Sequence, residues 1–224
     1  VPFVARDNDS NRLYGLWSAV AMFELNGGRY GQSSSAKEVI DPVAPEGSDG
    51  KINLPKKMLI NEGGSPYDAG PRKVGYEFVG WSDNAGGYKT YSEYVAKWKN
   101  LYIEEYIKSL TTQTEEEKNT IKNQLVKEVV RDHEVYVERF KTLMGEEYVT
   151  NLLATSFKVY DENEEYTLTG DVTFYALWRQ VKVTVTFFKS IDDYKNGAGN
   201  GADSMATCDI WYGESWTLPT KYDT

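Results

Sequence analysis

The chain contains one histidine, His133, and one cysteine, Cys208. One residue of each type excludes an intrachain disulfide, a zinc cluster built from cysteine and histidine, and any reaction that needs two imidazoles. A histidine that acts as a general base needs a nucleophile and an orienting group, and the sequence shows neither for His133. We therefore expect His133 to pack in or beside the core on the second predicted helix, and Cys208 to be an ordinary strand residue.

Three short segments carry part of a binding motif and lack the rest. Residues 7–11 (Asp-Asn-Asp-Ser-Asn) open like a calcium loop, but Arg12 stands where that loop needs glycine and Ser18 where it needs glutamate. Residues 199–203 are weakly similar to part of a nonapeptide calcium-binding repeat, but that architecture requires several copies and the segment occurs once, which favours a flexible hairpin loop. Residues 27–35 are rich in glycine and serine but lack the Gly-Lys-Ser/Thr of a phosphate loop. We predict no metal and no cofactor.

Acidic residues are abundant but form no catalytic pattern. Glu115, Glu116 and Glu117 follow Thr114, which is typical of a helix start. A glycan hydrolase would need two carboxyl groups about 5–10 Å apart in a cleft, and no motif points to such a pair. We therefore predict that the protein is not an enzyme.

Aromatic residues are the stronger candidates for binding. Three tryptophans stand at the ends of apolar, strand-like runs, which favours core packing over sugar stacking: Trp17, Trp81 and Trp178. Four others spread over the wide apolar arc of one predicted helix, and we expect them to form an interaction surface: Tyr94, Trp98, Tyr102 and Tyr106. Three near the C-terminus are the basis of an alternative, the stacking of sugars: Trp211, Tyr212 and Trp216.

The composition narrows the class of partner. Lys and Arg number 25 against 34 Asp and Glu, a formal net charge of −9, whereas a nucleic-acid binder needs a basic face. No run of about 18 apolar residues occurs, so we predict no membrane insertion. The chain starts at Val1 without a basic-then-apolar leader, and we expect any secretion signal to lie upstream or to have been removed.

Glycine and proline divide the chain into a helical middle and two strand-rich flanks. Residues 89–158 contain a single glycine, Gly145, whereas all seven prolines and the other glycines lie outside this segment. Ser92 is the predicted N-cap of a first helix that runs to about Leu110. Thr114 begins a second helix, predicted to continue for about thirty residues or roughly 45 Å until Gly145 stops it. A third, short helix is predicted to follow.

Alternation of apolar and polar residues predicts half-buried strands in both flanks. Three segments show it: residues 73–81, 171–178 and 181–187. In the first of them, Val74, Tyr76 and Phe78 are expected on one face. Asn26-Gly27 follows an apolar run and predicts a hairpin turn, because both turn positions need a positive φ.

The two flanks also repeat one another. Residues 13–17 (Leu-Tyr-Gly-Leu-Trp) match residues 174–178 (Phe-Tyr-Ala-Leu-Trp), and Leu54-Pro55 is matched later by Leu218-Pro219. These matches occur in the same order, which indicates a duplicated module. The predicted organisation is the end of a preceding module (1–17), a complete module (18–88 with 159–178), an inserted helical subdomain (89–158) and the start of a following module (179–224). A partial module cannot bury its own apolar face, so the last one could pair with the preceding module, pair with another chain or stay partly mobile.

These motifs resemble the Listeria–Bacteroides repeat, the internalin B-repeat family of bacterial surface proteins. The resemblance rests on residues 21–28 (Ala-Met-Phe-Glu-Leu-Asn-Gly-Gly), 75–81 (Gly-Tyr-Glu-Phe-Val-Gly-Trp) and 170–178 (Gly-Asp-Val-Thr-Phe-Tyr-Ala-Leu-Trp). It implies a compact α+β, ubiquitin-like β-grasp module, strung in tandem on a secreted or wall-attached bacterial protein, with no catalytic residues to carry over. The chain departs from the family pattern in a longer loop at 29–50 and in the helical insertion, on which the resemblance is silent.

We therefore predict an α+β protein in which a β-grasp-like module is interrupted by a helical insertion and flanked by partial copies of itself. Its predicted role is that of a non-enzymatic extracellular spacer and adhesion or protein-interaction module. The predicted partner is a host or bacterial surface protein, with a glycan as a further possibility. The alternative function is a carbohydrate-binding module, alone or as an accessory to a secreted glycan-degrading enzyme.

Overall fold

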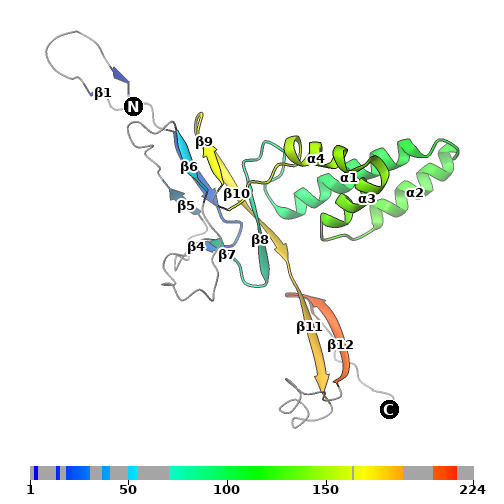
Figure 1. Ribbon diagram of the computed structural model, residues 1–224. Coiled ribbons are helices and arrows are strands. Elements are labelled where there is room, and N and C mark those ends of the chain that lie inside the picture. Colours follow the sequence, from blue (N-terminus) through cyan, green and yellow to red (C-terminus); the bar gives the residue numbers. More distant parts are fainter. Residues whose placement is uncertain are drawn as a thin grey trace.

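The computed structural model describes residues 3–4, 14–15, 19–30, 37–40, 50–54, 71–162, 164–188 and 204–215. Within these residues the protein is a mixed α+β structure with four helices and several small sheets, which confirms the predicted class (Figure 1). Several sequence candidates lie outside the described residues: Trp17, Trp216, Leu218 and the segments 7–11 and 199–203.

One four-stranded sheet organises the β part. Its strands lie in the order β5 (Lys37–Ile40), β3 (Ala21–Glu24), β10 (Val172–Gln180) and β8 (Tyr76–Ser82). The central strands β3 and β10 run parallel, with Phe23 opposite Phe174, and each pairs antiparallel with its outer neighbour. Parallel neighbours need a long crossover, and the chain between β3 and β10 includes the whole helical middle.

The other described strands form sheets of two. The pairs are β1 (Phe3–Val4) with β2 (Tyr14–Gly15), β4 (Arg29–Tyr30) with β7 (Pro71–Arg72), β6 (Lys51–Asn53) with β9 (Glu165–Thr167), and β11 (Lys182–Phe188) with β12 (Ser204–Trp211). The predicted turn forms, since Asn26 and Gly27 have φ angles of 48° and 77°. It does not close a hairpin, however, because β4 pairs with β7 while β3 pairs with β5.

The buried residues around Phe23, Trp81 and Phe174 form a core on one face of the four-stranded sheet, and we call it the sheet core. The two halves of β8 present different residues to it. Tyr76 and Phe78 pack on that core, as their alternation predicts. Val74 does not share their face, because it lies in the turn before the strand and is 78% exposed. The predicted strand therefore starts too early, since alternation in the sequence continues into a turn that the glycine at position 75 makes with a φ of 76°.

A bulge changes the side to which β8 turns its side chains. The register against β10 shifts between Phe78 and Gly80, so Val79 faces the helices and Trp81 returns to the sheet core. Gly80 has a φ of 149°, and a Cβ there would lie 2.5 Å from Val159. The bulge therefore requires glycine at this position.

Strand β10 is covered on both faces near its C-terminal end. Phe174, Ala176 and Trp178 belong to the sheet core, and their alternation was predicted. Leu177 points to the other side, into a second core formed by the helices. This strand therefore connects the two cores of the protein.

The helical region consists of α1 (Tyr91–Ser109), α2 (Glu115–Lys127), α3 (Glu134–Met144) and α4 (Glu146–Thr155). The N-cap of α1 is Thr90 and not Ser92, because Thr90 and Glu93 form a reciprocal capping box. Thr114 caps α2 as predicted. Gly145 ends α3 with a φ of 91°, which also confirms the predicted stop.

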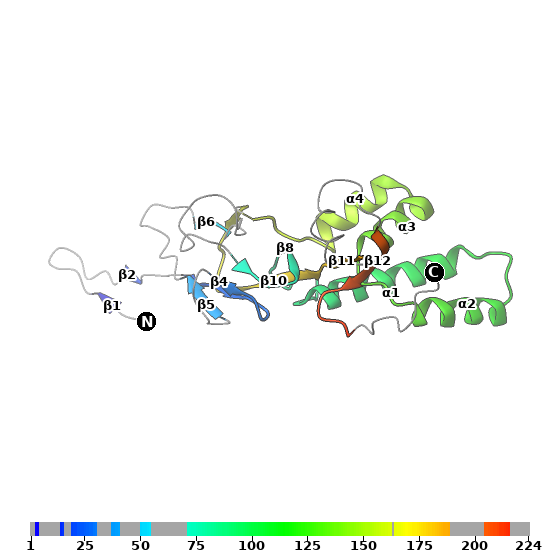
Figure 2. The same ribbon diagram turned by 90° about the horizontal axis from the view of Figure 1, so that it is seen from below.

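The prediction of a single second helix of about thirty residues is wrong. Residues 128–133 interrupt it, and α3 packs on α1 and α4. The apolar side chains of α3 explain the break, because Phe140 reaches the ring of Trp98 at a centroid distance of 5.7 Å only when α3 returns to α1. An unbroken helix would carry Phe140 past the end of its partner. In Figure 2, α2 lies alongside the distal part of α1.

The hairpin β11–β12 follows the main sheet directly. Only Val181 separates β10 from β11. In Figure 1 this hairpin projects away from the four-stranded sheet, on the side opposite β1. Val183 is 40% exposed, so β11 is less buried than its alternation predicts.

Candidate functional site

The four aromatic residues predicted as an interaction surface lie in the helical region. Tyr94, Trp98 and Tyr102 are only 1%, 0% and 8% exposed, and Tyr106 stacks on Tyr102 as a partly buried neighbour. The first three are therefore core residues and cannot form an exposed contact surface. The wide apolar arc of α1 has another cause, since this helix contacts three elements, α2, α3 and β10.

Two of the three repeat-defining tryptophans are core residues, as predicted. Trp81 is completely buried and Trp178 nearly so. The indole N–H of Trp178 donates to the carbonyl of Leu25 at 2.7 Å, which ties β10 to the residue that follows β3. This bond satisfies the polar atom that burial of a tryptophan leaves in need of a partner.

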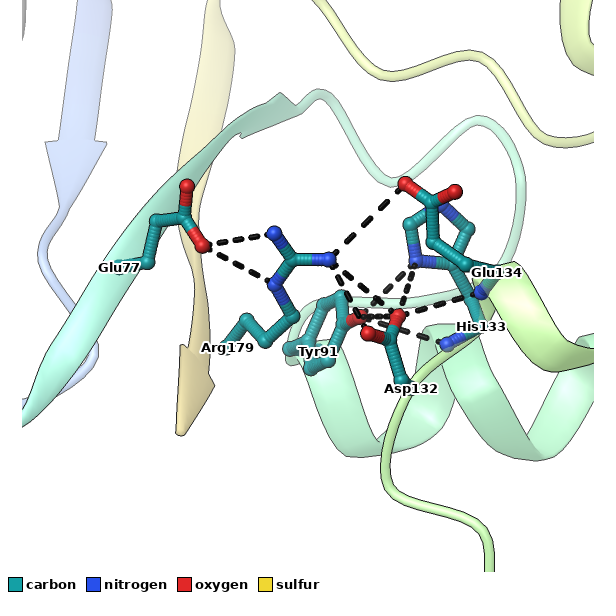
Figure 3. Close-up of polar contacts among 6 residues, drawn as sticks. All are labelled: Glu77, Tyr91, Asp132, His133, Glu134 and Arg179. Carbon is teal, nitrogen blue, oxygen red and sulfur yellow. Dashed lines mark hydrogen bonds and ion pairs between the residues drawn. The ribbon is translucent and has the colours of Figure 1, made fainter. Parts of the chain in front are cut away.

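A cluster of polar side chains joins the sheet to the helical region, and we call it the junction. It consists of Glu77 on β8, Arg179 on β10, Tyr91 on α1, and Asp132, His133 and Glu134 at the start of α3 (Figure 3). Arg179 is the centre of the cluster, as Figure 3 shows. These residues come from four elements, so they meet only in the folded chain.

The guanidinium of Arg179 binds carboxylates on both sides. Its Nε and Nη2 donate to Oε2 of Glu77 at 3.1 and 2.6 Å, and its Nη1 donates to both carboxylate oxygens of Asp132 at 3.3 and 3.2 Å. Glu134 lies 3.9 Å from the same nitrogen. Burial opposes the charge of Arg179, but the hydrogen bonds to Glu77 and the charge of Asp132 outweigh it and raise the pKa of Arg179.

Asp132 also binds the first residue of α3. Its Oδ1 accepts from the backbone N–H of Glu134 and from the hydroxyl of Tyr91, both at 3.1 Å. Burial alone would raise the pKa of Asp132, but the N–H of Glu134 and the charge of Arg179 hold it below the ordinary value. This carboxylate therefore stays ionised at neutral pH.

His133 contributes its ring to the same cluster. Its Nδ1 lies 2.9 Å from the hydroxyl oxygen of Tyr91. Because the hydroxyl donates its one proton to Asp132, the consistent tautomer of His133 carries a proton on Nδ1 and donates it to Tyr91. Burial lowers the pKa of His133, so the ring is neutral at pH 7. His133 therefore packs beside the core, but it lies in the interruption before α3 and not on a continuous second helix.

The ion pairs of the junction hold the sheet and the helical region together, and they leave no group free for acid–base or nucleophilic chemistry. The three carboxylates of the junction all face Arg179, so none is left as an uncompensated base. Burial raises the pKa of Tyr91 well above its ordinary value, so its hydroxyl keeps its proton. Among the residues that the structure describes, no three His, Cys, Asp or Glu side chains are placed to share a metal ion.

A pocket of about 350 Å³ opens beside the junction, between α1 and the ends of β8 and β10. Its lining includes Tyr91, Val95, Lys99, Arg131, Trp178 and Gln180. The ammonium group of Lys99 is engaged by the carbonyls of Val126 and Glu128, each at 2.6 Å. The Lys99 ammonium group that lines the pocket is therefore already hydrogen-bonded at the C-terminal end of α2.

Two of the three aromatic residues of the alternative function, Trp211 and Tyr212, lie at the base of the β11–β12 hairpin, whereas Trp216 lies outside the described residues. Arg131 and Lys182 lie over the ring of Trp211 at 5.3 and 5.2 Å, and Arg131 is also paired with Glu214. The ring of Tyr212 packs where a side chain at Gly75 would have to lie. A sugar that stacked on a face of Trp211 covered by these cations would have to displace them.

Sequence reasoning singled out only His133 of the six junction residues. Glu77 and Arg179 are separated by 102 residues, and Arg179 and Asp132 by 47. No motif or periodic pattern links positions so far apart. The one available signal is the charged residue directly after the closing Trp178, because a charged residue on a central strand needs a partner.

No helix within the described part of the chain is both long and apolar enough to cross a membrane. Comparisons of the chain with protein-family models, with curated proteins and with solved structures found no match.

Proposed function

We propose that this chain is a non-enzymatic extracellular repeat module of a bacterial surface protein, which acts as a spacer and as a protein-interaction module. The proposal depends on the motif resemblance of the sequence. One structural observation supports it above the others, namely the direct continuation of β10 into the first strand of the next hairpin.

This connection leaves little freedom between consecutive modules. The N–H of Val181 donates to the carbonyl of Gly75 at 3.0 Å, and its carbonyl accepts from the N–H of Tyr212 at 3.0 Å. The side chain of Gln180 adds a bond to the carbonyl of Tyr212 at 2.6 Å. A short connection that is bonded on both sides transmits force and orientation from one module to the next, as a spacer requires.

The order of the four-stranded sheet agrees with a β-grasp module. In sequence order β3, β5, β8 and β10 are its first to fourth strands, and in space they lie second, first, fourth, third with the first and fourth parallel. This is the arrangement that the family resemblance implies. The helices α1–α4 lie between the third and fourth strands, where we propose that they are an insertion.

We place the contact surface of the helical region at the connection between α2 and α3. Val129 is 79% exposed there, and Val126 and Val135 on either side are exposed as well. Val129 and Val126 are the two most exposed large apolar side chains of the helical region, which makes them the best candidates there for an apolar contact with a protein partner. Tyr94, Trp98 and Tyr102, in contrast, are buried in the interior of the helical region.

Adhesion is tested with the intact chain, labelled at its N-terminus, on cultured host cells and on bacterial cells. We expect saturable binding to one of these surfaces. The double variant Val126→Ser with Val129→Ser is expected to bind at least about tenfold more weakly, because burial of a valine side chain contributes about 1.5 kcal/mol or more and a tenfold change in affinity is about 1.4 kcal/mol.

Val74→Ser is the matched control, because Val74 is equally exposed but lies before β8. It should bind like the unaltered chain. Absence of binding to every surface, or equal losses in both variants, would rule out the proposed interaction surface.

A further inference from the structure

The connection between α2 and α3 has a second surface besides its exposed valines. This connection comprises residues 128–133, and Arg131 on it reaches the β11–β12 hairpin. Nη2 of Arg131 forms an ion pair with Oε1 of Glu214, and its Cζ lies 5.3 Å from the centre of the Trp211 ring. Trp211 is the last residue of β12, and Glu214 follows it by three positions. The helical region and the hairpin are therefore in direct contact.

Gln180, the last residue of β10, takes part in the same contact. Nη1 of Arg131 donates to Oε1 of Gln180 at 3.4 Å, and Nε2 of Gln180 donates to the carbonyl of Tyr212 at 2.6 Å. The ammonium group of Lys182 lies over the ring of Trp211 as well, at 5.2 Å. The helical connection, the end of β10 and the end of β12 thus share one polar contact.

The residues on either side of Arg131 hold its backbone in place. Val130 packs against the helical core, and Asp132 binds the guanidinium of Arg179 on β10 at 3.2 and 3.3 Å. A long side chain loses conformational entropy when a contact fixes it, and a backbone that is already held reduces the total cost of ordering. Arg131 is therefore well placed to link the helical region to the hairpin.

The hairpin has another attachment, just before β8. The carbonyl of Gly75 accepts from the N–H of Val181 at 3.0 Å. The ring of Tyr212 lies close against Gly75, since a Cβ at position 75 would lie 1.8 Å from Cδ1 of Tyr212. Units joined by a short connection and a small contact are expected to move relative to each other. A second attachment, from the helical region, restricts that motion.

We propose that the helical region is a brace, in which the surface around Arg131 binds the end of the β11–β12 hairpin and fixes the direction in which the chain leaves the four-stranded sheet. The partner that this surface fits is a β-hairpin that ends in an aromatic ring followed by a carboxylate, here Trp211 and Glu214. The inference rests on the spacer role of the proposed function, because a fixed direction matters between consecutive modules. It does not depend on the adhesive role.

The contact is suited to orienting the hairpin more than to stabilising the fold. The side chains of Arg131 and Glu214 are 35% and 40% exposed. Ion pairs between partly exposed groups contribute little to the free energy of unfolding. Loss of Arg131 should therefore leave the urea midpoint of the chain nearly unchanged while it frees the hairpin to move.

Pulsed electron paramagnetic resonance between two spin labels measures the position of the hairpin. One label is attached on α1 at Asn100→Cys and the other on β11 at Thr186→Cys, both at exposed positions, in the intact chain with Cys208→Ser. We expect one narrow distribution of distances in this parent chain. Arg131→Ala should make the distribution at least about twofold broader, because the hairpin then loses its attachment to the helical region.

Arg139→Ala is the matched control. Arg139 also forms an ion pair, with both carboxylate oxygens of Glu128 at 2.6 and 2.7 Å, but this pair lies entirely within the helical region. Its removal should leave the distribution as narrow as in the parent chain. Equal broadening by Arg139→Ala would mean that Arg131→Ala acts by loosening the helices, which would overturn the inference.

A charge exchange keeps the test independent of the folding of any one variant. Arg131→Glu and Glu214→Arg each bring like charges together and should broaden the distribution, whereas the two changes combined should restore the narrow one. A combined variant as broad as the single ones, or an Arg131→Ala chain as narrow as the parent, would overturn the inference. The distance measurement uses no cell surface, so its outcome is read separately from the cell-binding experiment that tests the proposed function.

Discussion

Helices α1 and α2 begin in the same way but are held very differently. Both start with a threonine capping box, Thr90 with Glu93 and Thr114 with Glu117. Six residues of α1 are buried, whereas α2 buries none. Local capping therefore determines where each helix starts, and tertiary packing determines how much each contributes to global stability.

The attachments of the two helices explain this difference. α1 carries the centre of the helical core, and Tyr91 at its start enters the junction with Asp132 and His133. α2 is held by the partly buried Leu125 and by bonds at its C-terminal end, where Lys99 binds two carbonyls. Helix α1 is thus part of the helical core, whereas α2 lies on the surface of that core.

The largest expected effect is that of Trp98→Ala. Trp98 is buried and its ring stacks on Phe157 with centroids 3.9 Å apart, so its removal should lower the free energy of unfolding by about 3–5 kcal/mol. Leu125→Ala on α2 should cost about 1 kcal/mol, because the side chain is only partly buried. Urea unfolding followed by circular dichroism measures both. Equal losses would show that α2 belongs to the core after all.

Arg179→Ala should have the next largest effect, because it releases α3 from the sheet and leaves Glu77 and Asp132 without their cation. We expect a loss of about 1–2 kcal/mol, since the group is partly exposed. Lys118→Ala on α2 removes the exposed ion pair with Glu115 and should cost less than about 0.5 kcal/mol. A double-mutant cycle of Arg179→Ala with Asp132→Asn should give a coupling of about 1 kcal/mol. A coupling of zero would contradict the role of Arg179 in joining sheet and helices.

The two capping threonines give a smaller and more direct comparison. Thr90→Ala should cost about 1 kcal/mol of global stability, because α1 unfolds only with the core. Thr114→Ala removes the same bond but should mainly increase hydrogen exchange in the first turn of α2. Exchange at single amides, measured with global unfolding, separates the two results. The comparison fails if Thr114→Ala lowers global stability as much as Thr90→Ala.

The smallest expected effect is a pH dependence that arises at the start of α3. Burial holds the pKa of His133 below its unfolded value of 6.5. Below that pH the unfolded chain binds a proton that the folded chain resists, so stability falls as the pH falls below 6.5 and levels off once the folded ring is protonated as well. His133 is the only histidine, so His133→Gln should remove this slope. Asp132, whose pKa is also lowered, acts in a separate window, below its ordinary value of 3.8.

Much of the local structure could be predicted from neighbouring residues. The concentration of glycine and proline outside residues 89–158 located the helices, and Thr114 and Gly145 marked a start and a stop that the structure confirms. Alternation located β10 and the core positions of Phe174 and Trp178. The N-cap of α1 was placed two residues too late, because Thr90 and Ser92 are both good caps and only Thr90 has Glu93 in the reciprocal position.

The sequence by itself thus determined the helix starts and stops, the strand alternation and the repeated motifs, because caps, glycine and side-chain period act within a few residues. The break after Lys127, the burial of Tyr94 and Trp98, and the junction around Arg179 were decided only by tertiary structure. Each of these depends on residues tens of positions apart. The packing of the elements decides which neighbour the apolar face of a helix contacts. It also decides which carboxylate a charged residue such as Arg179 binds.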